Sequence, residues 1–115
     1  MNTSLTSIYT AHYRYSGEDR VDITVKGQHP EWKLLAPTWG MVMGIKNDTM
    51  SEDEYIAKYL KMLDAVPISV WNKLFQMSTI TLVCFCNKDA FCHRNILTNY
   101  ICDSVCCIQY HGWRE

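Results

Sequence analysis

The residues best suited to chemistry lie between Cys84 and Arg94, a stretch that holds three cysteines, a histidine and an arginine. An apolar run ends at Cys86, a polar segment follows, and Cys92-His93-Arg94 comes next at the expected start of a helix. Free amides at a helix start bind anions, and arginine is a bidentate donor for phosphate or carboxylate. The stretch therefore predicts a site for a phosphorylated ligand, with Cys86, His93 and Arg94 as ligand-binding residues.

The same residues could also perform nucleophilic catalysis. The positive end of a helix dipole lowers the pKa of a nearby thiol and favours its thiolate, so Cys92 is a candidate catalytic nucleophile. His93 or another base would assist it. A phosphatase loop of the Cys-x5-Arg type is absent, because Arg94 stands eight residues after Cys86 and two residues after Cys92.

Two further interpretations of this stretch stay open. Cys84, Cys86, Cys92 and His93 are residue types that bind metals. However, Cys-x-Cys-x5-Cys-His is not a standard zinc spacing, and neighbouring ligands are awkward on a helix, so we assign no metal ligand. Alternatively, the cysteines of the apolar run pack as small hydrophobic side chains, and His93 and Arg94 make only local contacts.

Polar and aromatic residues elsewhere are candidates for the same site. Asp22 could act as a base or bind a ribose hydroxyl, and Thr24 projects from the same face of its segment. The alternative for Asp22 is an ion pair with Arg20 or Lys26. Trp39 could stack on a base, and its alternative is core packing. The remaining candidate ligand-binding residues are Arg14, Arg20 and Thr38.

The elements that must position these residues follow from hydrophobic spacing and turn signals. We expect strands over 5–15, 79–86 and 105–110, a strand or extended loop over 21–25, and helices over 37–46, 52–64, 92–104 and from Pro67 onward. The run 79–86 is continuously apolar, which is typical of a central strand buried on both faces. This order favours one domain over 1–115, a small three-layer Rossmann-like α/β fold with a short, mainly parallel sheet.

Composition limits the classes of function. The chain has 115 residues, and 11 basic against 12 acidic side chains give a net charge of −1. Non-specific binding to nucleic acid needs a basic excess, so we do not expect it. No stretch reads as a membrane span or a signal peptide, which predicts a cytoplasmic protein with reduced cysteines, or one in the host cytoplasm if a phage encodes it.

The segment ITLVCFCNKDAFCHRNIL resembles the C-terminal signature of the domain-of-unknown-function family 488 (DUF488), in which an apolar strand and a polar loop precede Cys-His-Arg. The upstream segments YRYSGEDRVDITVKG, LLAPTWGMVMGIKN and EYIAKYLKML resemble a subgroup of that family found in bacteria and phages. The resemblance covers nearly the whole chain. It implies a compact Rossmann-like α/β domain and carries no activity with it.

Together these patterns favour a protein that binds, and could act on, a nucleotide or another phosphorylated small molecule at the Cys-His-Arg loop. They leave open whether it is an enzyme and name no cofactor. One alternative is a non-enzymatic interaction protein that modulates a host factor, because four tryptophans and seven tyrosines suit a protein interface. The other alternative is a Cys/His metal-binding protein.

Overall fold

The computed structural model describes residues 6–26, 32–86, 90–105 and 108–114. Its strands form one sheet in the order β2-β3-β1-β4, and each of the described pairings is parallel. The strands are β1 (Thr6–His12), β2 (Arg20–Asp22), β3 (Thr79–Cys84) and β4 (Ile108–Arg114). The helices are the short 3-10 helix η1 (Lys33–Leu35), then α1 (Trp39–Lys46), α2 (Glu52–Asp64), α3 (Ile68–Leu74) and α4 (His93–Ser104). The expected Rossmann-like α/β fold is confirmed.

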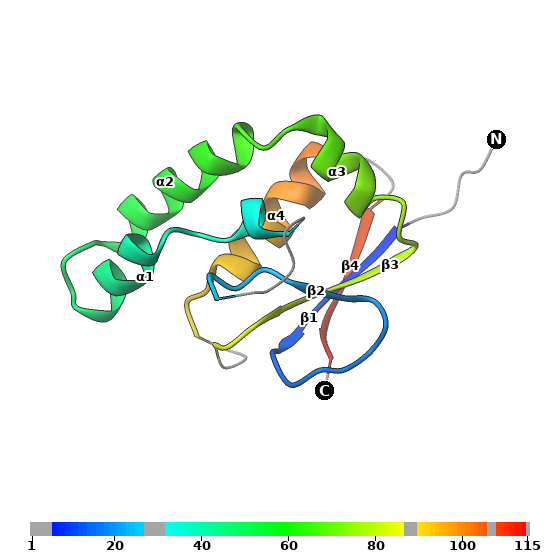
Figure 1. The fold of residues 1–115 in the computed structure, drawn as a ribbon, viewed down its shortest axis with the longest axis horizontal. Helices are drawn as coiled ribbons and strands as arrows, with labels where there is room; N and C mark the ends of the chain where they lie inside the picture. Colours follow the sequence, from blue (N-terminus) through cyan, green and yellow to red (C-terminus); the bar gives the residue numbers. More distant parts are fainter. Residues whose placement is uncertain (1–5, 27–31, 87–89, 106–107, 115) are drawn as a thin grey trace.

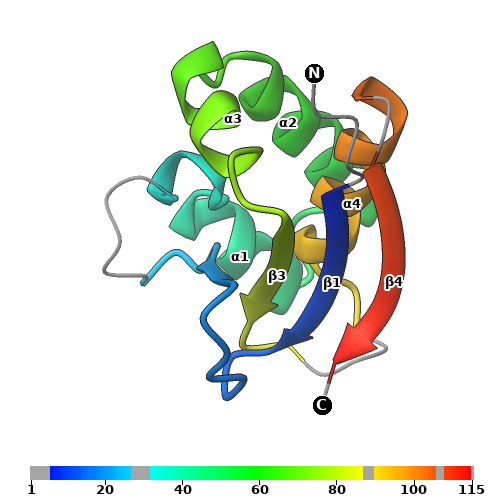
Figure 2. The same cartoon turned by 90° about the vertical axis from the view of Figure 1, so that its right-hand side faces the viewer.

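The helices gather on one face of the sheet (Figures 1 and 2). Helix α4 packs against β1, β3 and β4, and α2 packs against α4. The core between them is apolar. It includes Ile8, Ile80 and Leu82 from the sheet, Leu97 and Ile101 from α4, and Tyr59 and Leu63 from α2.

Strand β3 is central and buried on both faces, as the apolar run predicted. Ile80 and Leu82 belong to the core on the helix side, so Thr81 between them points to the opposite face. There the Thr81 hydroxyl donates a hydrogen bond to Asp19 Oδ2 at 2.6 Å. The segment between β1 and β2 thus covers the face that the helices leave open.

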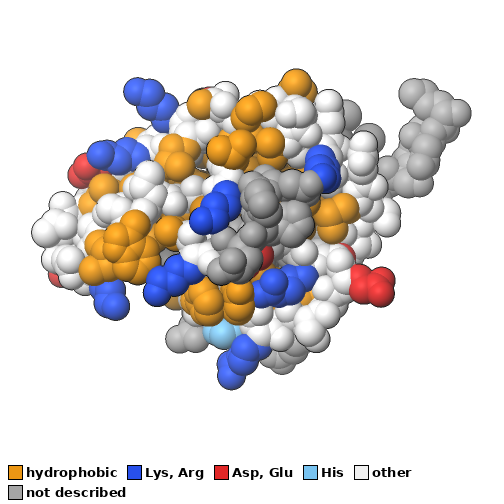
Figure 3. All heavy atoms as spheres, viewed as in Figure 1, with side chains coloured by type: hydrophobic (Ala, Val, Ile, Leu, Met, Phe, Trp, Pro, Cys, Tyr) orange, Lys and Arg blue, Asp and Glu red, His pale blue; other side chains and the backbone are white. Residues whose placement is uncertain are grey.

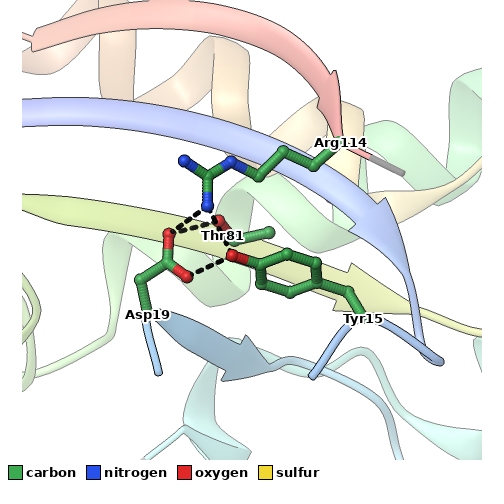
Figure 4. Close-up of polar contacts among 4 residues, drawn as sticks. All are labelled: Tyr15, Asp19, Thr81 and Arg114. Atoms are coloured by element: carbon green, nitrogen blue, oxygen red, sulfur yellow. Dashed lines mark hydrogen bonds and ion pairs between the residues drawn. The ribbon is translucent and has the colours of Figure 1, made fainter. Parts of the chain in front are cut away.

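A polar cluster of four residues ties this covering segment to the sheet (Figure 4). Tyr15 Oη donates to Asp19 Oδ1 at 2.6 Å, and Arg114 forms an ion pair with Asp19 Oδ2 at 3.2 Å. Arg114 also donates to the Tyr15 hydroxyl. The cluster therefore joins β4, β3 and the segment that precedes β2.

Several element boundaries follow local signals. The bounds of α2 agree with the predicted helix 52–64, because the Ser51 hydroxyl accepts a hydrogen bond from the Glu54 amide at 3.1 Å and caps the helix. Helix α1 begins after Thr38, whose hydroxyl accepts from the Met41 amide at 3.1 Å. No helix in the described part of the chain is long and apolar enough to cross a membrane.

The last strand differs most from its prediction. We expected it over 105–110, whereas β4 spans Ile108–Arg114. Its pairing with β1 shifts in register next to Ile8, and Gly112 there has a positive φ of 100°. This bulge interrupts the alternation that marks a strand in a sequence. We also expected a loop over 87–91 after the apolar run, and its positions 87–89 lie outside the described residues.

Candidate functional site

A pocket of about 490 Å³ opens at the carboxyl ends of β2 and β3. Its walls come from residues 24–26 after β2, one side of α1, Tyr55 near the start of α2, and residues on either side of the 87–89 segment. Ligands of open α/β sheets bind in such a place, beyond the carboxyl ends of the strands. The walls are mainly apolar, and they include Val42, Ile45 and Phe91.

Three cysteines and one histidine converge at this pocket, and all four line it. The Sγ atoms of Cys84 and Cys92 are 3.2 Å apart, and those of Cys84 and Cys86 are 3.8 Å apart. The Cys92 Sγ lies 3.7 Å from Nδ1 of His93. The fold thus brings Cys84 and Cys86, which follow β3, next to Cys92 and His93, which begin α4.

Backbone conformation explains why neighbouring residues converge. Cys92 precedes the first turn of α4 and is extended, with φ −155° and ψ 143°. The sequence argument against Cys92 and His93 as neighbouring ligands assumed that both are helical. Because Cys92 is not, its thiol and the His93 ring can face the same space.

His93 is held in one orientation and one protonation state. Its side chain is buried, and its Nε2 lies 2.6 Å from the carbonyl oxygen of Ile23. A carbonyl only accepts, so Nε2 carries the proton and Nδ1 presents a lone pair toward Cys92. Burial lowers the pKa of His93 to about 4, which keeps the ring neutral at neutral pH.

The thiols differ from the sequence expectation. We expected the helix dipole to lower the pKa of Cys92, and this is wrong. Hydrogen bonds with Cys84 and Cys86, together with burial, raise the pKa of Cys92 far above its usual range. The contacts with Cys84 and Cys92, aided by the Arg94 charge, instead hold the pKa of Cys86 well below its usual range. The role of Cys92 as a nucleophile stays a prediction.

Arg94 is fully buried and does not line the pocket. Its Nη1 atom donates to the carbonyl oxygens of Ala11, Cys84 and Cys86 at 3.2, 3.4 and 3.0 Å. Its guanidinium carbon also lies 4.8 Å from the centre of the Trp113 ring. The side chain therefore holds the ends of β1 and β3 together, and its predicted contact with a phosphate stays a prediction.

The other predicted residues divide between the pocket and its surroundings. Thr24 and Trp39 line the pocket, and Trp39 is 51% exposed, so it does not pack in the core. Asp22 does not line it. Its Oδ1 accepts hydrogen bonds from the Thr24 amide at 2.9 Å and from the Thr24 hydroxyl at 2.6 Å. The catalytic role predicted for Asp22 stays a prediction.

Three more of the predicted residues lie outside the pocket wall. Arg20 donates to the Tyr13 carbonyl at 3.0 Å and covers the Tyr13 ring. Thr38 caps α1, and the Arg14 side chain is exposed. Tyr13 itself stacks on Phe85 after β3, with ring centres 4.1 Å apart, as expected for adjacent parallel strands.

Sequence reasoning missed two cations of the pocket, Lys26 and Lys46. The Nζ atom of Lys26 lies 5.3 Å from the centre of the Trp39 ring. Lys46 follows Trp39 by seven positions, two helical turns, with Val42 between them, so the spacing along α1 could have shown that they share one face. Figure 3 shows Lys and Arg side chains interspersed with hydrophobic ones on one face of the molecule.

A comparison with known protein families assigns the chain to one of them. The family model DUF488-N3a, described as the active DUF488-N3 subclade, matches residues 2–104. The chain belongs to the DUF488-N3a family. The match reaches the last residue of α4 and stops before β4. No curated protein and no solved structure matches the chain. The resemblance to DUF488 seen in the sequence is thereby confirmed.

Proposed function

We propose that this DUF488-N3a protein binds a nucleotide, or a similar phosphorylated molecule with a planar ring, in the pocket at the ends of β2 and β3, and acts on it there. The volume of about 490 Å³ lies within the range of small-molecule sites. The description of the subclade as active supports a reaction rather than binding alone.

The observation that carries the proposal is an exposed aromatic ring with cations beside it. Trp39 is exposed at the pocket wall, Lys26 lies over its ring, and Lys46 is exposed on the same helix. A planar base stacks on tryptophan, and lysines attract phosphate. Among the described residues that line the pocket there is no Asp or Glu to repel an anion.

The reactive groups lie within reach of such a ligand. Cys84, Cys86, Cys92 and His93 line the same pocket as Trp39. A base held at the mouth by the aromatic ring would place the rest of the molecule against the thiols and the imidazole. This arrangement supports chemistry at the Cys/His cluster and leaves Arg94 as the residue that fixes the strand ends.

Binding of nucleoside monophosphates tests the proposal directly. We expect calorimetry to detect binding of a monophosphate, weaker binding of the matching nucleoside, and loss of most affinity in Trp39→Leu. Lys46→Ala should weaken monophosphate binding by about tenfold, or about 1.4 kcal/mol, and leave nucleoside binding unchanged. Lys61→Ala, which removes an exposed lysine of α2 outside the pocket wall, is the control.

Two results would contradict the proposal. One is the absence of binding by any nucleoside monophosphate. The other is binding whose affinity does not change in Trp39→Leu, in a variant that circular dichroism shows to be folded. Either result would favour the alternative of a protein-interaction function. In that case Trp39 and Phe85, two exposed large hydrophobic residues that line the pocket, would belong to the surface that contacts a partner.

A further inference from the structure

We propose that Cys84, Cys92 and His93 bind a divalent metal ion of the zinc class, with the fourth coordination position open to the pocket. The Sγ atoms of the two cysteines and a ring nitrogen of the histidine all lie within 4.8 Å of one another, and the three side chains are buried. The site does not depend on the ligand proposed above, because the three donors are assembled by the fold alone.

The distances between the donor atoms suit a tetrahedral ion. Zinc–sulfur bonds of about 2.3 Å and zinc–nitrogen bonds of about 2.0–2.1 Å place two sulfurs ~3.8 Å apart, and sulfur and nitrogen ~3.6 Å apart. The Cys92 Sγ is 3.7 Å from His93 Nδ1, which matches. The Cys84 and Cys92 sulfurs, at 3.2 Å, need to separate by about half an ångström to admit the ion.

The surroundings of His93 are those of a metal ligand. Histidines that bind metals usually donate their other ring N–H to a carbonyl or carboxylate, which fixes the tautomer and the ring. His93 does this through Nε2 and the Ile23 carbonyl at 2.6 Å, and Nδ1 is left facing Cys92. The ring is also packed edge-on against Tyr59, with centres 5.6 Å apart. The nitrogen lone pair is therefore aimed before any ion arrives.

Charge and donor type select the class of metal. Two thiolates and a neutral imidazole favour zinc over magnesium or calcium, which prefer oxygen ligands. On binding, each cysteine thiol releases its proton to solvent, so two thiolates neutralise the dication and the buried centre carries no net charge. Three protein ligands with an open fourth position are typical of catalytic rather than structural zinc sites. All three line the pocket, which supplies an entry path.

Cys86 is a neighbour of this centre and not one of its three ligands. Its Sγ lies 3.8 Å from that of Cys84, and the side chain is only partly buried. It is outside the group whose donor atoms all lie within 4.8 Å of one another. We therefore expect Cys86→Ser to keep the metal.

The test is the metal content of the whole chain, purified under reducing conditions without chelator. We expect about one zinc ion per chain by elemental analysis. Removal of zinc and addition of Co²⁺ alone should produce the intense thiolate-to-cobalt absorption and visible bands of a tetrahedral site. Cys84→Ser, Cys92→Ser and His93→Gln should each lose most of the bound metal. Cys102→Ser, which alters an exposed cysteine of α4, is the matched control and should keep it.

If a variant does not fold, metal binding by the wild-type protein still tests the proposal. Failure of the folded, reduced wild-type protein to bind Zn²⁺ or Co²⁺ would overturn it, as would full metal content in Cys92→Ser. Loss of metal in Cys86→Ser would overturn the three-residue ligand set. None of these measurements uses a nucleotide, so a negative result for metal binding can be told apart from a negative result for nucleotide binding.

Discussion

Asp19 shows how a single side chain can hold several elements of this fold. Its carboxylate accepts hydrogen bonds from the Thr81 and Tyr15 hydroxyls and faces the Arg114 guanidinium (Figure 4). Burial alone would raise the pKa of this carboxyl. The hydrogen bonds and the Arg114 charge outweigh burial, so the pKa of Asp19 falls below its ordinary value of 3.8. The charged carboxylate therefore stabilises the folded state.

The pH dependence of stability should reveal this contribution. A carboxyl whose pKa is lower in the folded state stabilises fully above its unfolded pKa, and this stabilisation is lost as the pH falls through the folded pKa. We expect Asp19→Asn to reduce the free energy of unfolding by about 2 kcal/mol near neutral pH. The difference from wild type should stay constant down to about pH 5 and shrink below about pH 4.

Urea unfolding of both proteins at each pH measures the difference. Asp103→Asn, at an exposed position of α4, is the control and should change stability little. A difference between Asp19→Asn and wild type that is the same at pH 3 as at neutral pH would show that the Asp19 charge does not stabilise the fold.

Among the elements, α1 has the largest share in the pocket relative to its length. It contributes Trp39, Val42, Ile45 and Lys46 to the wall from only eight residues. A helix so short depends on its caps and on packing, because isolated helices of this length are unstable. Its N-terminal cap is the Thr38 hydroxyl, which accepts from the Met41 amide. The cap therefore supports the helix that forms this part of the pocket wall, although Thr38 itself does not line the pocket.

Removal of this cap should affect affinity through the helix. Thr38→Ala is expected to cost about 1 kcal/mol of helix stability, to speed hydrogen exchange in the first turn of α1, and to weaken nucleotide binding severalfold. Ser51→Ala removes the equivalent cap of the longer α2 and serves as the comparison. It should cost similar stability but leave affinity closer to wild type. Equal loss of affinity in both variants would show that α1 has no special role.

At the scale of the whole molecule, Arg94 joins parts of the chain that are far apart in sequence. Its Nη1 bonds to Ala11 at the end of β1 and to Cys84 and Cys86 at and beyond the end of β3. It lies in the first turn of α4, so its side chain links that helix to the sheet. A phosphate ligand would need an accessible guanidinium, whereas Arg94 is 0% exposed.

The main effect of substituting Arg94 should therefore be a loss of folding stability rather than a direct loss of ligand contacts. Arg94→Met fills similar space but leaves buried carbonyls without this donor, and we expect a loss of about 3 kcal/mol or more in unfolding free energy. Arg20→Met, which removes a partly exposed donor to the Tyr13 carbonyl, should cost much less. Thermal and urea denaturation compare the two. Unchanged stability in Arg94→Met would return Arg94 to the predicted role of ligand.

The elements were more predictable than the contacts between them. The periodic spacing after Ser51 and the apolar run 79–86 predicted α2 and β3, although β3 ends at Cys84, because local burial patterns determine both. The sequence raised the cluster of thiols and His93 only as one alternative and discounted it, because the extended backbone of Cys92 that allows it is not visible in the sequence. The structural contacts of Arg94 could not be predicted either, because its partners are backbone carbonyls, which leave no trace in the residue types around it.

Strand β4 has a practical consequence for anyone who shortens this chain. The family match stops at 104, so an expression plasmid cut at that boundary would omit β4 entirely. The amides and carbonyls of β1 that pair with β4 would then be bare, and such an open edge recruits other chains. Asp19 would also lose Arg114. A truncated product should precipitate or form inclusion bodies, and the insolubility would reflect the choice of boundary rather than the behaviour of the protein itself.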